Sequence, residues 1–120
     1  MSSQKNLGFF QRLKFAYSGI LATLRKEKSF RTQTAISIGM LLLSLVIRPD
    51  LKWCAIFCLC IGNVLSFELI NSAVESICDF TTSEFQPQIK FTKDCAAGAV
   101  LISSIASVFI FLLFLLSLRS

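Results

Sequence analysis

The chain has 120 residues, of which 54% are hydrophobic, and it carries a formal net charge of +5. This length allows one domain, and the hydrophobic share exceeds that of ordinary soluble domains. About the first thirty residues are basic and lack an uninterrupted apolar core, so we expect no cleavable signal sequence. The absence of histidine and of any CxxC pair argues against a transition-metal site.

The N-terminal segment, residues 1–26, is predicted to be an amphipathic helix at the membrane interface. Seven of the twelve Lys and Arg residues precede Thr32, and aromatic and aliphatic residues are interleaved with them at loosely helical spacing. A basic amphipathic pattern of this kind is typical of an interfacial helix. We expect no binding of nucleic acid, because nothing else in the chain supplies a soluble recognition module.

Three apolar segments follow, and each is predicted to cross the membrane as a helix. The first covers residues 28–48 and ends at a proline turn, and the second covers residues 51–82 and extends past its apolar part into polar sequence. A cytoplasmic polar loop is expected at 83–92, before the third span at 93–118, of which residues 95–118 carry no charge. The predicted fold class is therefore an all-α membrane protein.

The basic residues are distributed unequally between the two sides that this topology defines. Nine lie in the N-terminal region and the second loop, and three lie on the opposite side. The positive-inside rule then places the N-terminus and the second loop in the cytoplasm. We expect a multi-pass protein of the bacterial cytoplasmic (inner) membrane, with access to cytoplasmic ATP.

The second span carries a line of polar residues on one helical face, namely Glu68, Asn71, Ser72, Glu75 and Asp79. At about 1.5 Å per residue, Glu68 lies roughly 22 Å along the helix, inside a hydrocarbon layer about 30 Å thick. An ionisable residue at this depth costs about 2.5 to 3.5 kcal/mol, so we interpret it as functional. Aligned carboxylates suit proton or cation movement, Mg²⁺ binding, or deprotonation of a hydroxyl nucleophile.

The second loop adds mixed charge near the cytoplasmic end of the same face. Glu84 and the Lys93-Asp94 pair are suited to holding a nucleotide phosphate and its metal ion. The chain has no GxxxxGK[ST] phosphate loop, and its five glycines are dispersed. A kinase built on this sequence would therefore be of an unusual kind.

Three blocks of sequence resemble the prokaryotic diacylglycerol kinase and undecaprenol kinase family of small membrane enzymes. They are GILATLRKEKSFR at residues 19–31, ELINSAVESICD at 68–79 and KDCAAGAVLI at 93–102. The second block is highly specific, and the resemblance covers about residues 8–118. It implies an N-terminal surface helix and three transmembrane helices in a homotrimer, with active sites between subunits.

The resemblance also implies roles for individual residues in the transfer of the γ-phosphate of ATP to a lipid alcohol. Glu68 is similar to the general base, and Glu27 and Glu75 are similar to the carboxylates that hold Mg²⁺. The implied nucleotide contacts are Arg12, Asn71, Glu84, Gln86, Lys93 and Asp94. The implied lipid contacts are Arg31, Gln33 and Ser72. The acceptor would be diacylglycerol or undecaprenol, with the first and third blocks somewhat closer to the undecaprenol branch.

The sequence departs from the family pattern at three positions. Gln86 stands where histidine is common in the family, and Gln33 stands where the family often has histidine or glutamate. Phe15 stands where a nucleotide-contacting tyrosine is found. Each proposed chemical group is still present. The departures concern nucleotide contacts and lipid choice.

Two other functions are compatible with the residues alone. In a small oligomeric proton- or cation-conducting protein, Glu68 and Glu75 would line a path at a subunit interface. Such a protein would conduct without nucleotide and would not need Glu27 or Lys93. In a structural membrane subunit without catalysis, replacing Glu68 by glutamine would be silent or stabilising.

Overall fold

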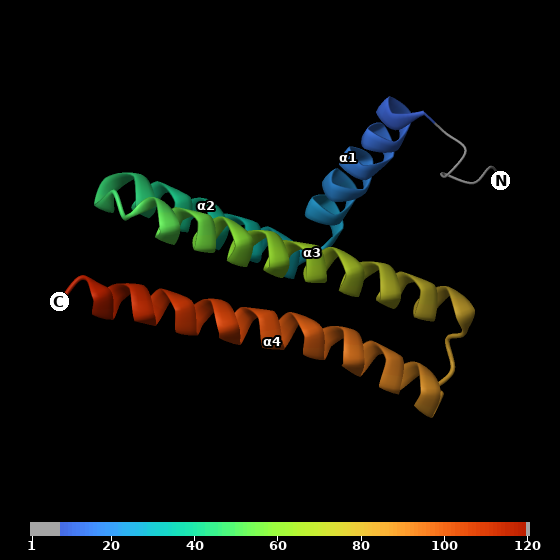
Figure 1. The fold of residues 1–120 in the computed structure, drawn as a ribbon. Helices are drawn as coiled ribbons and strands as arrows, with labels where there is room; N and C mark the ends of the chain where they lie inside the picture. The colour runs from blue at the N-terminus through green and yellow to red at the C-terminus, as the bar shows by residue number, and fades with distance from the viewer. Residues whose placement is uncertain (1–7, 120) are drawn as a thin grey trace.

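The computed structural model describes residues 8–119, which form four helices (Figure 1). They are α1 (Phe9–Lys26), α2 (Lys28–Ile47), α3 (Leu51–Thr81) and α4 (Pro87–Ser117). The all-helical class expected from the sequence is confirmed. The expected N-terminal segment at 1–26 begins outside the described residues.

Helices α2, α3 and α4 are each long and apolar enough to cross a membrane. Most of their large apolar side chains lie on the outside of the molecule, as Leu45, Leu59 and Leu113 illustrate. In water such a surface would be unfavourable, whereas lipid or a neighbouring protein would cover it at little cost. This is the arrangement of a multi-pass membrane protein.

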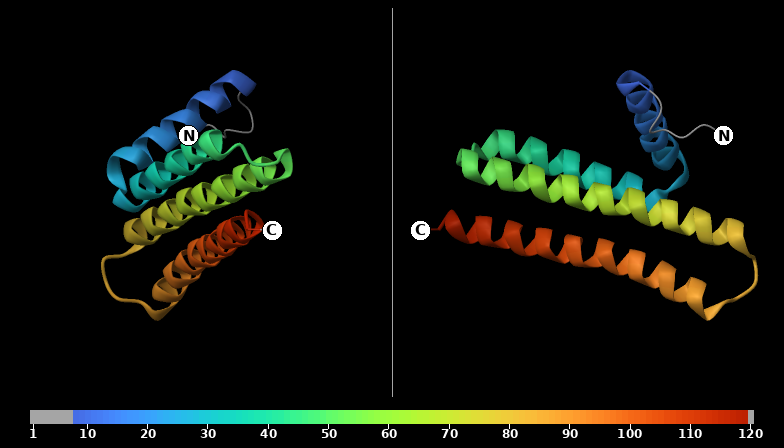
Figure 2. Two further views of the ribbon diagram at one scale, coloured as in Figure 1. Left: turned by 90° about the vertical axis from the view of Figure 1, so that its left-hand side faces the viewer. Right: turned by 45° about the vertical axis from the view of Figure 1, so that its right-hand side comes forward.

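Helix α3 lies between α2 and α4, and α1 stands away from these three at a steep angle (Figures 1 and 2). Helices α3 and α4 run antiparallel along almost their whole length. At one end Lys93 Nζ lies 2.6 Å from Asp79 Oδ1. At the other end the ring of Phe114 lies 5.1 Å from that of Phe57 and 5.3 Å from that of Trp53. These contacts fix the register of the two helices.

A single residue, Glu27, separates α1 from α2. Its extended backbone (φ −105°, ψ 113°) ends α1 and begins α2, so the chain turns sharply there. The Arg31 guanidinium braces this bend from the first turn of α2. Its Nη1 donates hydrogen bonds to the carbonyl oxygens of Leu24 at 2.9 Å and Arg25 at 2.8 Å, which satisfies carbonyls that the end of α1 would otherwise leave unpaired.

Helix α4 begins at Pro87, whereas the sequence placed residues 83–92 in a polar loop. The difference has a physical reason. Proline is favoured in the first turn of a helix, because its fixed φ suits the helix and its missing N–H is not needed there. Residues 88–92 mix polar and apolar side chains and contain no helix breaker, so they continue as helix and lengthen α4 beyond its apolar part.

Candidate functional site

A buried carboxylate, Glu68, lies near the middle of α3. Its side chain is only 4% exposed, and it is the only buried acid among residues 8–119. The hydroxyl of Ser29, in the first turn of α2, donates a hydrogen bond to Glu68 Oε2 at 3.2 Å. The Glu27 bend places this turn of α2 against α3. Ser29 could not be predicted from the sequence, because only the packing of α2 on α3 brings it to the acid.

One to two turns further along α3, Asn71 and Glu75 form a second polar contact. Asn71 Nδ2 donates to Glu75 Oε1 at 3.3 Å. The Asn71 Oδ1 atom is buried and has no partner within the described part of the chain. A buried acceptor without a partner is unfavourable, which sets this oxygen apart from the hydrogen-bonded polar atoms around it.

The carboxylates of Glu27 and Glu75 line one cavity of about 720 Å³, together with Ser72 and Asp79. The cavity lies between α1, the Glu27 bend and α3. Its volume falls within the range of about 300 to 1,000 Å³ that is typical of ligand sites. The structure therefore brings together two acids that are far apart in the sequence and that the family resemblance paired.

The donor set of this cavity fits Mg²⁺ bound together with a nucleotide. Mg²⁺ prefers oxygen ligands, and in nucleotide sites it is held by one or two carboxylates with substrate phosphates. No group of three or more His, Cys, Asp or Glu side chains within residues 8–119 could hold a metal by itself. Glu27 and Glu75 alone would thus leave coordination positions for phosphate oxygens and water.

A second cavity, of about 620 Å³, lies beyond Asp79 at the α3–α4 end of the molecule. It is lined by Asp79, Glu84, Gln86, Lys90 and Lys93, with several neutral residues of the connecting loop. Asp79 lines both cavities and forms an ion pair with Lys93. The acid-lined cavity is therefore continued by a region of mixed charge.

Six of the predicted site residues line neither of these two cavities in a single chain, namely Glu68 and Asn71, described above, and Arg12, Arg31, Gln33 and Asp94. Arg12 lines a separate cavity on α1. Asp94 faces solvent and pairs with Lys90 at 2.6 Å. Arg31 contacts the carbonyl oxygens at the end of α1.

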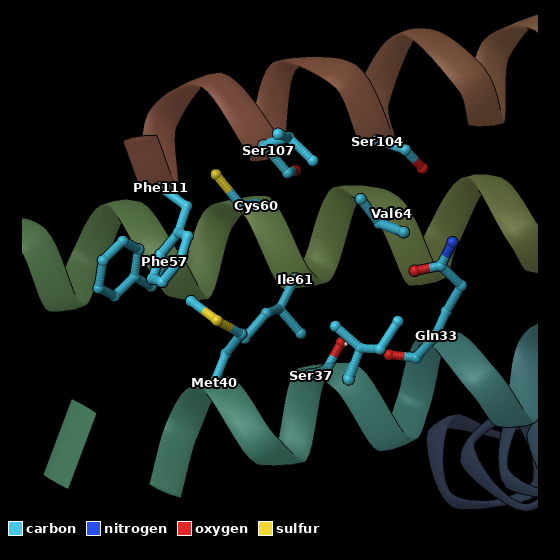
Figure 3. A pocket seen from close by; sticks show the side chains of 12 residues that line it. Gln33, Ser37, Met40, Phe57, Cys60, Ile61, Val64, Ser104, Ser107 and Phe111 are labelled. Carbon is cyan, nitrogen blue, oxygen red and sulfur yellow. Dashed lines mark hydrogen bonds between the residues drawn. The ribbon is translucent and has the colours of Figure 1, made fainter. Parts of the chain in front are cut away.

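An apolar groove of about 350 Å³ runs between α2, α3 and α4 (Figure 3). Gln33, a predicted lipid contact, lines it. The other lining residues are Ile36, Ser37, Met40, Phe57, Cys60, Ile61, Val64, Ser104, Ser107, Val108 and Phe111. Val64, which lines the groove, precedes Glu68 by about one turn of α3. Ser72 and Asp79, which line the charged cavities, follow Glu68 on the same helix. Along α3 the groove and the charged cavities therefore lie on opposite sides of the buried acid.

The chain is similar to known proteins over most of its length. The model of the family described as prokaryotic diacylglycerol kinase matches residues 14–115. An undecaprenol kinase of Bacillus subtilis is 36% identical, with 90% of this chain and 88% of the relative covered. A diacylglycerol kinase of Helicobacter pylori strain J99 is 34% identical, with 91% and 85% covered.

A diacylglycerol kinase of Synechocystis is 30% identical over 81% of this chain and 56% of that relative. The family matches are spread over all four helices and include the segments that carry Glu27, Glu68, Glu75 and Lys93. They confirm the resemblance found in the three sequence blocks. The chain belongs to the prokaryotic diacylglycerol kinase family and is a lipid kinase.

Proposed function

We propose that this kinase transfers the γ-phosphate of Mg-ATP to the hydroxyl of diacylglycerol or undecaprenol. The relatives are named for these two acceptors. One observation carries the proposal: along α3 the buried Glu68 lies between Val64, which lines the apolar groove, and Ser72, which lines the cavity that also contains Glu27 and Glu75. A lipid alcohol and a nucleotide could thus reach the same acid from opposite sides.

Glu68 is the proposed general base. A carboxylate that accepts the proton of a lipid hydroxyl makes its oxygen a better nucleophile toward the γ-phosphorus. Phosphoryl transfer otherwise needs mainly in-line positioning and stabilisation of charge on the phosphoryl oxygens. The hydrogen bond from Ser29 supports this role, because it holds one carboxylate oxygen in a fixed direction and leaves the other for the substrate.

Glu27 and Glu75 are the proposed ligands of Mg²⁺. When bound, the ion would neutralise negative charge on the β- and γ-phosphates. Asn71 orients Glu75 through its amide, and Ser72 lies on the same cavity wall. Ser72 was predicted to contact lipid, but its position supports a contact with the nucleotide or the transferred phosphate.

The second cavity is the proposed site for the rest of the nucleotide. Lys93 supplies a positive charge next to the carboxylate-lined cavity, and Glu84 and Gln86 supply hydrogen-bond acceptors and a donor. Asp94 would act from the rim. Arg12 lies away from both cavities in one chain, so its proposed nucleotide contact requires a neighbouring subunit or a different position of α1.

The proposed assembly is a homotrimer in the bacterial inner membrane. The extensive exposed apolar surface supports coverage by lipid and by other subunits. Helix α1 carries basic residues and exposed aromatic residues, of which Phe10 and Tyr17 are examples, and it diverges from the spanning helices (Figure 1). Both features support a position along the cytoplasmic membrane surface.

The function is tested by incubating the purified protein in lipid–detergent micelles with Mg-ATP labelled at the γ-phosphate and either lipid. We expect labelled phosphatidic acid or undecaprenyl phosphate in the organic phase. Proteoliposomes with an ion gradient provide the comparison for a conducting protein. Ion flux without nucleotide, together with no labelled lipid, would overturn the proposal.

Replacing Lys93 with methionine is expected to raise the KM for ATP about tenfold and to leave the KM for lipid unchanged. Methionine keeps much of the side-chain length but removes the charge that would face a phosphate. The Lys93–Asp79 pair is largely exposed, so its loss should change stability little. Initial rates at varied ATP test the expectation, and equal effects on both KM values would contradict it.

Replacing Ser29 with alanine is expected to lower kcat about three- to tenfold, with little change in the KM for ATP. The carboxylate of Glu68 would lose the hydroxyl that orients it. Threonine at the same position should restore most of the rate because it retains the hydroxyl. The matched control is Ser44→Ala on the same helix, whose hydroxyl donates only to the Met40 carbonyl; a kcat loss of equal size there would exclude a specific role for Ser29.

A further inference from the structure

The apolar groove has one polar end. In Figure 3, Gln33 reaches from α2 toward Val64 of α3, and Ser104 of α4 lies at the same end. Met40, Phe57 and Phe111 lie at the other end. A bound molecule would therefore place apolar groups along most of the groove and meet amide and hydroxyl groups only where Gln33 and Ser104 lie.

The polar end of the groove is also the end next to the proposed base. Val64 and Glu68 are four residues apart on α3 and are both buried, so they share one face of the helix. Gln33 is four residues beyond Ser29 on α2, and Ser29 donates to Glu68. Both helices thus place the end of the groove about one helical turn, roughly 5.4 Å, from the acid.

Ser104 differs from the serines around it because its hydroxyl has no hydrogen-bond partner within residues 8–119. Its Oγ is buried and unpaired within the described part of the chain. Ser103 Oγ donates to the Val100 carbonyl at 3.0 Å, and Ser107 Oγ donates to the Ser103 carbonyl at 2.9 Å. Serine in a spanning helix normally satisfies its hydroxyl in this way. An unpaired hydroxyl at the edge of a groove is thus a donor without an acceptor.

We propose that this end of the groove recognises an ester carbonyl of a diacylglycerol, with Ser104 Oγ and the Gln33 amide as donors. The proposal rests on the kinase function above and identifies the acceptor lipid. A diacylglycerol carries ester carbonyl oxygens a few bonds from its free hydroxyl, so they would meet Ser104 and Gln33 while the hydroxyl approaches Glu68. A polyprenol carries no polar atom besides its hydroxyl.

The preference for a diacylglycerol over an acceptor without ester carbonyls follows from the cost of leaving a buried hydrogen-bond donor unpaired. Ser104 Oγ is already buried without a partner within the described residues, so a lipid carbonyl that accepts from it relieves an existing cost, whereas a carbonyl-free acceptor gains nothing there and binds more weakly. We expect the enzyme to use a diacylglycerol with about tenfold higher kcat/KM than the dialkyl ether of glycerol with the same chains. The two lipids share the glycerol hydroxyl and differ in the ester carbonyls.

The experiment compares three acceptors, namely the diacylglycerol, its dialkyl ether and undecaprenol, at saturating Mg-ATP. In Ser104→Ala the KM for the diacylglycerol should rise about tenfold, while the KM for the ether stays within about twofold. Ser103→Ala is the matched control, because Ser103 is adjacent, does not line the groove and already has a partner. The control should keep the preference of the unaltered enzyme.

The outcomes separate this inference from the kinase function. Equal kcat/KM for the diester and the ether in the unaltered enzyme would overturn the inference. A preference for undecaprenol that Ser104→Ala does not change would also overturn it. Both outcomes leave the kinase function intact. Phosphorylation of none of the three lipids would instead contradict the kinase function itself.

Discussion

Replacing Glu68 with glutamine is expected to lower kcat for lipid phosphorylation by about 10²- to 10⁴-fold and to leave Mg-ATP binding unchanged. Glutamine has the shape of the carboxylate and can still accept the hydrogen bond from Ser29, but it cannot take a proton from the lipid hydroxyl. The residue is buried and outside both charged cavities, so the nucleotide site should be undisturbed.

The same substitution should leave stability unchanged or raise it, because it removes a buried acid from the spanning region. Initial rates, ATP binding and thermal unfolding in detergent are measured on the same preparation. Asp50→Asn serves as the control, since Asp50 caps the start of α3 through its side chain, a role that asparagine can also fill. Full activity in Glu68→Gln would remove Glu68 from the mechanism.

Replacing Glu27 or Glu75 with glutamine is expected to raise the free Mg²⁺ concentration needed for half-maximal rate by about ten- to a hundredfold. Each change removes one negative ligand from the same cavity while preserving side-chain volume. In Glu75→Gln the amide oxygen can still accept from Asn71 Nδ2, so the effect reports on charge rather than on a lost hydrogen bond.

The two carboxylates should act as one unit. In the double variant, the rise in the Mg²⁺ concentration needed for half-maximal rate is therefore expected to be smaller than the product of the two single rises. The reason is that the effects of two residues that share one ligand are not additive. Rates are measured across Mg²⁺ concentrations at fixed ATP. An unchanged Mg²⁺ dependence in both single variants, or in Glu75→Gln alone, would show that this cavity does not hold the ion.

The acidic face of α3 could be predicted from the sequence, because the spacing of Glu68, Asn71, Glu75 and Asp79 lies within one helix. The partners supplied by other helices could not. Ser29 is one of many serines in an apolar chain, and only the bend at Glu27 and the packing of α2 on α3 bring its hydroxyl to Glu68. Glu27 itself was found through the family resemblance and not through spacing.

Arg31 makes a contact that the sequence did not reveal. A basic residue near a membrane interface indicates a phosphate or lipid contact, but carbonyl oxygens at the end of a helix attract the same guanidinium. In the structure Arg31 binds the last carbonyls of α1. The competition was invisible in the sequence because it depends on α1 ending only one residue before α2 begins.

The most direct test of the account measures two products of one reaction, namely ADP and phosphorylated lipid, in the same micellar sample. If the γ-phosphate is transferred to a lipid hydroxyl that the groove holds at Glu68, ADP and lipid phosphate form in equal amounts. The Glu68→Gln variant should then form neither product. ADP formed without lipid phosphate would mean that water is the acceptor, and it would contradict a site built to present a lipid alcohol to this acid.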